Sequence, residues 1–346
     1  MRVVSIVGAR PQFIKVAPIA WRAKGLFEHL IVHTGQHYDP ELSSNFFSEL
    51  EIPEPINNLY SGSGSHGVQT ARILIGVEEV LSELKPDWVL VYGDTNSTIA
   101  ATLAAVKIGL RVGHIEAGLR SFNRSMPEEI NRVGTDHLSD LLFVPTEEAM
   151  VNLEKEGLSS KSLQVGDVMV ETLLHIKKKI ATKIQNPKPQ IFATIHRAEN
   201  TNSRERLEKI VSRLSKSSIP VHLHAHPRLI KKAEEFGIPL SQGAIKVLKP
   251  ATYLGTLQGI GESVGVITDS GGLQKEAYLL ERPCLTVRTE SEWVETFNGS
   301  WNQLDPELKQ VEDNWWEMER TAINPHLYGD GLTSRKILDA LLSYSA

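Results

Sequence analysis

The sequence lacks the features of a secreted, membrane-bound or nucleic-acid-binding protein. Its one cysteine, Cys284, excludes an intramolecular disulfide, and the apolar neighbours of that residue predict a buried side chain. No apolar run approaches the roughly 20 residues of a membrane-spanning helix, and no signal-peptide pattern precedes the first predicted strand. The 37 basic and 42 acidic residues leave a formal net charge of -5, which gives no bulk attraction to nucleic acid or to an anionic membrane surface. We therefore expect a soluble cytoplasmic protein that holds any anionic ligand through local groups.

Two common nucleotide-binding fingerprints are also missing. A predicted strand at residues 3–7 leads through a tight turn into a helix, and the connecting sequence is GARPQFIK. This sequence lacks the glycines of the G-x-G-x-x-G motif and the Lys-Ser/Thr pair of the P-loop. A helix N-terminus with two nearby cations, Arg10 and Lys15, can still hold a phosphate group. An ordinary surface charge explains Arg10 equally well.

The order of strands and helices predicts two α/β domains. A length of 346 residues exceeds the roughly 100–200 residues of a single domain. Short β-rich runs alternate with helical segments, which is typical of a doubly wound parallel sheet. A Pro-rich break follows the helical segment at residues 168–184, and a new strand then restarts the pattern. We predict one Rossmann-like domain at residues 1–167, with a terminal helix at 333–346 packing back on it, and a second at 168–332.

Three acidic residues lie at predicted turns in the first half. Asp94 and Glu116 each follow a short apolar run, and Glu128 lies in the next loop. In an open parallel sheet, ligands bind in the crevice beyond the carboxyl ends of the strands. A single acid at such a place is more often a helix N-cap, and Glu128 and Glu129 after Pro127 fit the first turn of a helix. Glu116 precedes a glycine and no helical run, so capping explains it poorly.

The second half carries its own cluster after a strand, TDSGGLQKE at residues 268–276. Gly271 and Gly272 let backbone amides approach a ligand closely, and Ser270 adds a hydroxyl at a helix N-terminus that favours an anion. A structural turn would explain the glycines but not the polar residues around them. We therefore predict a phosphate cradle, with Glu276 within reach of sugar hydroxyls.

The histidines give weaker signals. His196 follows a predicted strand at residues 191–195, where a structural role is common and a catalytic role depends on the groups that face the ring. His33 and His37 have no partners at metal-ligand spacing. No metal site is predicted.

Seven motifs occur in a fixed order along nearly the whole chain: GARPQFIK, VYGDTNST, HIEAGLRS, MPEEINR, IHRAEN, TDSGG and YGDG. In this order they resemble the non-hydrolysing UDP-N-acetylglucosamine 2-epimerases. The resemblance implies two Rossmann-like domains in a GT-B-type arrangement, a nucleotide sugar in the cleft between them, no cofactor and a homodimer. The catalytic residues that it implies are Asp94, Glu116, Glu128 and His196. The UDP-binding residues that it implies are Arg10, Lys15, Ser270, Gly271, Gly272 and Glu276.

Some positions depart from the common pattern of that family. Arg288 stands in the sequence RTESEWVE where many members have Arg-Pro, and residues 250–256 lack the glutamine often used around the uracil. Residues 34–39 differ from the version that, in bacterial relatives, helps to bind a second substrate molecule as an activator. Together with SFNRSMPEE, these variants resemble the subgroup that acts on UDP-2,3-diacetamido-glucuronic acid. Both sugars remain open.

The resemblance also implies a mechanism in which UDP leaves, the C2 proton is lost to give a glycal, and both return with the other face protonated. That chemistry needs carboxylates on both faces of the sugar ring and groups that stabilise the leaving diphosphate. Glu116 and Glu128 are the predicted acid/base pair. Asp94 is predicted to stabilise the developing positive charge or to act as a third base, and His196 to donate to the leaving phosphate. Because a fold does not fix function, a GT-B glycosyltransferase and a catalytically silent nucleotide-sugar sensor are the alternatives.

Overall fold

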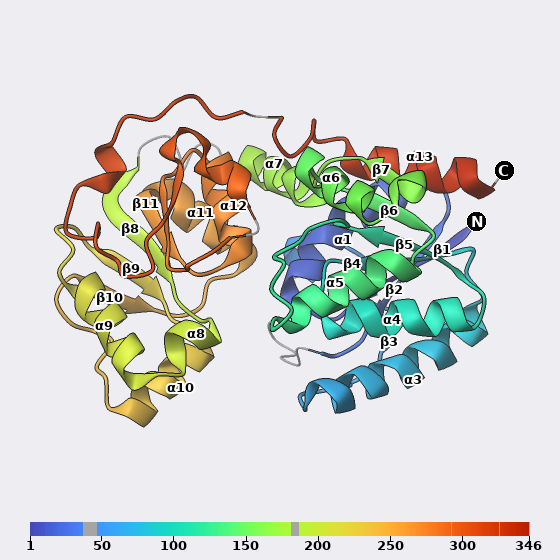
Figure 1. Cartoon of the computed structure of the whole chain (residues 1–346), viewed down its shortest axis with the longest axis horizontal. Coiled ribbons are helices and arrows are strands. Elements are labelled where there is room, and N and C mark those ends of the chain that lie inside the picture. Colours follow the sequence, from blue (N-terminus) through green and yellow to red (C-terminus); the bar gives the residue numbers. More distant parts are fainter. Residues whose placement is uncertain (37–46, 181–186, 292, 325, 346) are drawn as a thin grey trace. The chain divides into compact units, whose positions relative to one another are not determined.

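The computed structural model describes residues 1–36, 47–180, 187–291, 293–324 and 326–345. It divides into two compact units: unit 1 comprises Met1–His175 with His326–Ala346, and unit 2 comprises Ile176–Pro325 (Figure 1). The boundary predicted after residue 167 falls inside unit 1, because the first turns of helix α7 pack with that unit. That the two units are the two predicted domains stays a prediction.

The unit 1 sheet has seven parallel strands in the order β3-β2-β1-β4-β5-β6-β7. The strands are β1 (Arg2–Val7), β2 (Glu28–His33), β3 (Asn57–Asn58), β4 (Trp88–Tyr92), β5 (Arg111–Ile115), β6 (Leu141–Val144) and β7 (Ser162–Gln164). The chain builds outward from β1 to β3 and then returns to the other side of β1 with β4. The topological switch point, where such sheets bind ligands, therefore lies between β1 and β4. The turns after these strands carry residues 8–15 and Asp94.

The helices of unit 1 are α1 (Arg10–Ala23), α3 (His66–Leu84), α4 (Asn96–Lys107), α5 (Pro127–Leu138), α6 (Glu147–Lys155), η1 (Ser159–Lys161), α7 (Val168–Ile180) and α13 (Thr333–Ser345). Helices α3, α4 and α5 lie side by side (Figure 1). The alanines of α4 are fully buried between α3 and the sheet. Their small side chains let α4 approach both neighbours closely. Helix α13 packs on α1, where Arg22 donates to Ser334 Oγ over 2.9 Å.

Unit 2 repeats the architecture with six parallel strands in the order β10-β9-β8-β11-β12-β13. The strands are β8 (Lys188–Thr194), β9 (Val221–His224), β10 (Ile245–Leu248), β11 (Ser263–Thr268), β12 (Cys284–Thr286) and β13 (Asn302–Leu304). The helices are α8 (Ala198–Thr201), α9 (Arg204–Ser215), α10 (Pro227–Phe236), α11 (Tyr253–Glu262), α12 (Gly271–Leu279), η3 (Val294–Ser300) and η4 (Trp315–Glu317). The order reverses at β8 and β11, so His196 and Ser270 follow the two strands of this switch point.

The predicted fold class is therefore confirmed: each unit is a doubly wound parallel sheet of the Rossmann-like type that GT-B proteins contain. Cys284 is buried, as its apolar neighbours predicted. Among the described helices, none combines the length and the apolar composition that a membrane span needs.

Candidate active site

Glu116 follows β5 and has a backbone conformation that non-glycine residues seldom adopt. Its φ is +74°, in the left-handed region where non-glycine residues store strain, and such residues cluster at functional sites. The Glu116 carboxylate forms an ion pair with the ammonium of Lys15, which reaches across from α1 and is buried. Lys15 was predicted to contact a diphosphate, and in the structure its ammonium also lies against a carboxylate. Its role toward the diphosphate stays a prediction.

Asp94 lies in the turn after β4 and is paired with Arg132 of α5. It does not cap the following helix. Thr95 is the N-cap, and its hydroxyl accepts a hydrogen bond from the amide of Thr98. Burial by itself would raise the pKa of Asp94, but the charges of Arg132 and Lys15 outweigh it and hold that pKa below its ordinary value. Asp94 is therefore a carboxylate at neutral pH.

Glu128 and Glu129 begin α5 and have different surroundings. Glu129 is buried, and its carboxylate accepts the amides of Ser121 and Phe122 over 2.9 and 3.0 Å and pairs with Arg132 at 3.0 Å. It therefore holds the loop that precedes α5. Glu128 is exposed and makes no hydrogen bond or ion pair with any residue that the structure describes. Of the two acids, Glu128 has the carboxylate available to a ligand.

Sequence reasoning missed the residue that joins the two turns of the switch point. The side-chain oxygen of Gln12 accepts the amides of Gly8 and Ala9 over 2.7 and 3.0 Å, and its amide group donates to the Tyr92 carbonyl over 2.8 Å. Gln12 thus fixes the loop after β1 against the turn that carries Asp94. The only signal of Gln12 in the sequence is that a polar residue precedes apolar residues in the first turn of the helix. Arg10 begins the same helix and is half-buried.

Asp269 organises the corresponding turn in unit 2, and sequence reasoning missed it too. Its carboxylate accepts the amides of His196 and Arg197 and the side-chain amide of Asn200 over 2.9 to 3.1 Å, and it lies 3.0 Å from Nδ1 of His196. Burial would raise the pKa of Asp269, but these partners outweigh it and lower the pKa. An ionised Asp269 places a proton on Nδ1. The His196 side chain is still 37% exposed, so its Nε2 can meet a ligand.

The predicted phosphate cradle lies at the N-terminus of α12. Ser270 is the N-cap, its side chain makes no capping hydrogen bond, and Gly271 and Gly272 form the first turn. The hydroxyl and the free amides of that turn are therefore available to an anion. Glu276 lies further along α12 and is buried.

The described residues contain no group of three or more His, Cys, Asp and Glu side chains placed to hold a metal ion. His33 is buried, its Nδ1 accepts the amide of Gly35 over 2.8 Å, and its ring packs on Phe13 with centroids 5.2 Å apart. His33 therefore has a structural role. His37 lies outside the described residues.

Arg132→Gln is expected to raise the pKa of Asp94, because the nearest cation is lost while burial remains. A carboxylate whose pKa is lowered by folding stabilises the folded state. This contribution is complete at a pH above its pKa in the unfolded chain, about 4, and is lost as the pH falls through its pKa in the folded state. The unfolding free energy of the variant should therefore depend less on acid pH. Carboxyl carbon NMR would follow the titration directly, with the exposed Arg124→Gln as the control. An unchanged Asp94 titration in Arg132→Gln would contradict this account.

Residues 20–342 match the family model described as UDP-N-acetylglucosamine 2-epimerase. The chain is 46% identical to a UDP-N-acetylglucosamine 2-epimerase homolog of Methanococcus maripaludis, over 99% of both chains. It is 42% identical to the UDP-2,3-diacetamido-2,3-dideoxy-D-glucuronate 2-epimerase of Pseudomonas aeruginosa, also over 99% of both. Its structure resembles the UDP-GlcNAc 2-epimerase of Methanocaldococcus jannaschii in complex with UDP-GlcNAc and UDP, with a TM-score of 0.91 and 38% identity over 99% of this chain and 100% of that chain. The chain belongs to the UDP-N-acetylglucosamine 2-epimerase family.

Proposed function

We propose that this chain epimerises C2 of a UDP-sugar, either UDP-N-acetylglucosamine to UDP-N-acetylmannosamine or the corresponding diacetamido-glucuronate to mannuronate pair. The observation that supports this proposal most is the set of three carboxylates after the carboxyl ends of β4 and β5 and at the start of α5. A glycosyltransferase needs a nucleotide-sugar cradle and an acceptor site, but it does not need three carboxylates here. Full-length similarity to relatives named for both sugars supports both substrates.

The carboxylates of unit 1 supply what a C2 inversion requires. The C1–O bond breaks with its electron pair on UDP, the C2 proton passes to a carboxylate, and a C1–C2 double bond forms. A second carboxyl group, in its protonated form, then gives its proton to the opposite face of C2 and becomes a carboxylate as UDP adds back to C1. We assign these two roles to Glu116 and Glu128. Asp94, ionised because of its lowered pKa, stabilises positive charge on the ring as the C1–O bond breaks.

Unit 2 supplies groups for the leaving UDP. Nε2 of His196 can donate to a phosphate oxygen while Nδ1 is held by Asp269. Ser270, Gly271 and Gly272 can hold the diphosphate on amides and a hydroxyl, and Glu276 is assigned to the ribose hydroxyls. Arg10 of unit 1 adds a cation. That one sugar nucleotide contacts both units is part of this proposal.

Incubation of the enzyme with each UDP-sugar alone in D₂O, followed by proton NMR, tests the function. One of the two sugars is expected to give its C2 epimer, with deuterium at C2 of the product. A glycosyltransferase would leave either sugar unepimerised without an acceptor, and a sensor would bind without turnover. Product without deuterium at C2 after full equilibration would contradict elimination. Glu116→Gln protein purified in the same way controls for a contaminating epimerase.

We also propose that the protein is a cytoplasmic homodimer, as the family resemblance implies. Light scattering of the purified chain would measure the mass in solution. A monomer at assay concentration would contradict the dimer without affecting the assignment of the reaction.

A further inference from the structure

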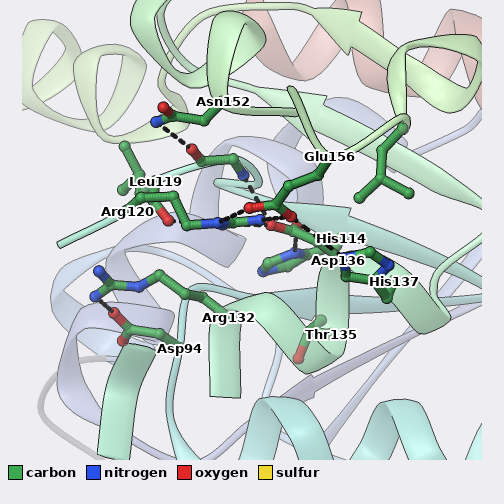
Figure 2. A network of polar contacts seen from close by, with 12 residues as sticks. Asp94, His114, Leu119, Arg120, Arg132, Thr135, Asp136, His137, Asn152 and Glu156 are labelled. Atoms are coloured by element: carbon green, nitrogen blue, oxygen red, sulfur yellow. Dashed lines mark hydrogen bonds and ion pairs between the residues drawn. The ribbon is translucent and has the colours of Figure 1, made fainter. Parts of the chain in front are cut away.

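A network of ion pairs joins the side chains of β5, α5 and the end of α6 (Figure 2). We call it the His114 network, and its members are His114 of β5, Asp136 of α5, Arg120 of the loop after β5, and Glu156 at the end of α6. His114 and Asp136 are both 0% exposed. Nδ1 of His114 lies 2.7 Å from Oδ1 of Asp136, and Nε2 lies 2.7 Å from the carbonyl oxygen of Gly93.

The partners of His114 determine its protonation. A backbone carbonyl can only accept, so Nε2 carries a proton that it donates to Gly93. Oδ2 of Asp136 accepts the amide of Gly118 over 3.1 Å and lies 2.8 Å from Nη1 of Arg120. The Gly118 amide and the Arg120 guanidinium are both donors, and a guanidinium contact favours the ionised carboxylate. An ionised Asp136 accepts at both oxygens, so Nδ1 of His114 is the donor in the hydrogen bond between them.

Arg120 also makes a two-pronged contact with Glu156 over 2.7 and 2.8 Å. A doubly protonated His114 would give these four side chains two cations and two carboxylates. The ammonium of Lys161 lies at the edge of the network, where it donates to the backbone carbonyl of Asp136 over 2.9 Å. An unpaired charge at this depth would be strongly destabilising, whereas a complete set of hydrogen-bonded pairs is tolerated. His137 lies 3.3 Å from Glu156 at the exposed end of the network.

The two ends of the His114–Asp136 pair reach the two turns of the site. Gly93, with a φ of +64°, is the residue before Asp94. Gly118, with a φ of +83°, is two residues after Glu116, and a Cβ there would come within 2.5 Å of the Ala149 carbonyl oxygen. Glycine adopts both conformations without strain, whereas Glu116 in the second turn has a positive φ that needs outside support. A single ion pair provides a hydrogen bond to each of the two turns.

We propose that His114 is a doubly protonated positioning residue for the C2 epimerisation. Its Nε2–H holds the Asp94 turn through Gly93, and its Nδ1–H holds Asp136, which in turn holds the Glu116 turn through Gly118. The pair sets the separation of the two carboxylates, and the imidazolium favours the ionised form of Asp94. This role rests on the proposed function, whereas the protonation state of His114 does not.

Asp136→Asn separates the charge from the geometry. Its side-chain oxygen can still accept from Gly118 and Arg120, and its amide group then donates to Nδ1 of His114. The hydrogen bond from Nε2 to Gly93 survives, but the imidazole becomes neutral. Asp140→Asn is the matched control, because Asp140 accepts the Val112 amide over 2.8 Å near the start of the same strand and has no contact with His114.

The first measurement is ¹H–¹⁵N NMR of the histidine rings in the wild-type protein at about pH 8, where an ordinary histidine, with a pKa of about 6.5, is neutral. His114, assigned by the loss of its signals in His114→Gln, is expected to show two protonated ring nitrogens. In Asp136→Asn it should show one. One protonated nitrogen in the wild-type protein would overturn the proposal, whatever the enzyme activity.

The second measurement is the split between kcat and KM. Asp136→Asn is expected to lower kcat on the order of 10- to 100-fold, while KM and UDP binding stay nearly constant. The charge-assisted hydrogen bonds that hold the two turns become weaker neutral ones, and small displacements of reacting groups then slow the reaction. Asp140→Asn should keep wild-type kcat. A folded Asp136→Asn with a neutral His114 and wild-type kcat would overturn the positioning role. A wild-type protein with a doubly protonated His114 but no turnover of either sugar would instead overturn the proposed function.

Discussion

Replacing Glu116 or Glu128 by Gln is expected to lower turnover of the UDP-sugar by about 10²- to 10⁴-fold, the usual effect of removing a proton-transfer group. Glutamine keeps the size and polarity of each side chain but cannot accept a proton. Glu116 is held in a strained turn against Lys15, and Glu128 is exposed on the first turn of α5. Both variants should still bind UDP, because neither residue is assigned to the nucleotide.

Isotope exchange in D₂O would show which carboxylate serves which face of C2. An enzyme that lacks the acid for one face can still remove the proton from the other face, form the glycal and return the same epimer. One variant is therefore expected to exchange the C2 proton of the gluco epimer without inverting it, and the other to exchange that of the manno epimer. Near-normal turnover in both variants would refute the assignment. The exposed Glu154→Gln on α6 is the matched control and should behave as wild type.

Glu116→Gln is also expected to destabilise the fold, and a double variant separates this effect from the loss of turnover. The buried Lys15 ammonium loses its counter-charge, and breaking one side of a buried ion pair destabilises a protein by about 3–5 kcal/mol. Lys15→Met combined with Glu116→Gln removes the unpaired charge, so we expect it to recover most of the stability. Turnover should remain low in the double variant. Recovery of both would mean that Glu116 acts only through the fold.

The positions of the candidate residues followed from the sequence, but their partners did not. Alternating apolar runs and helical segments place Asp94, Glu116 and Ser270 after strand ends, and the structure has strands ending at Tyr92, Ile115 and Thr268. A strand end fixes where a side chain begins, because the sheet determines the backbone there. It does not fix which charge that side chain meets.

Lys15 illustrates this limit. A cation near a helix N-terminus predicted a phosphate contact, which stays a prediction. The sequence did not show that the long side chain also reaches the turn after β5 and pairs with Glu116. Glu128 and Glu129 are equivalent as a first-turn pair in the sequence, and they differ only because the loop before α5 turns its amides toward Glu129. His114 in HIEAGLRS and Asp269 in TDSGG are in the quoted motifs. Their roles depend on contacts between residues far apart in the chain.

Asp269→Asn is expected to destabilise unit 2 by about 3 kcal/mol or more, because buried hydrogen bonds to charged groups contribute about 1.5–3 kcal/mol each and an unmatched buried donor is unfavourable. All its partners are donors: two backbone amides, the Asn200 amide group and Nδ1 of His196. An Asn amide group must face one of them with its own hydrogens. Exchange of the His196 and Arg197 amides with D₂O should accelerate, and UDP binding should weaken.

The acid dependence tests whether the charge of Asp269 is the cause. The pKa of Asp269 is lowered in the folded state. Its contribution to the unfolding free energy is therefore complete at a pH above its pKa in the unfolded chain, about 4, and is lost as the pH falls through its pKa in the folded state. The stability difference between wild type and Asp269→Asn should therefore be largest near neutral pH and shrink in acid. The exposed Asp313→Asn should show no difference at any pH. A difference between wild type and Asp269→Asn that stays constant down to strongly acid pH would mean that Asp269 acts through its shape. The proposed donation from Nε2 of His196 to the leaving phosphate would then lack an ionised partner at Nδ1.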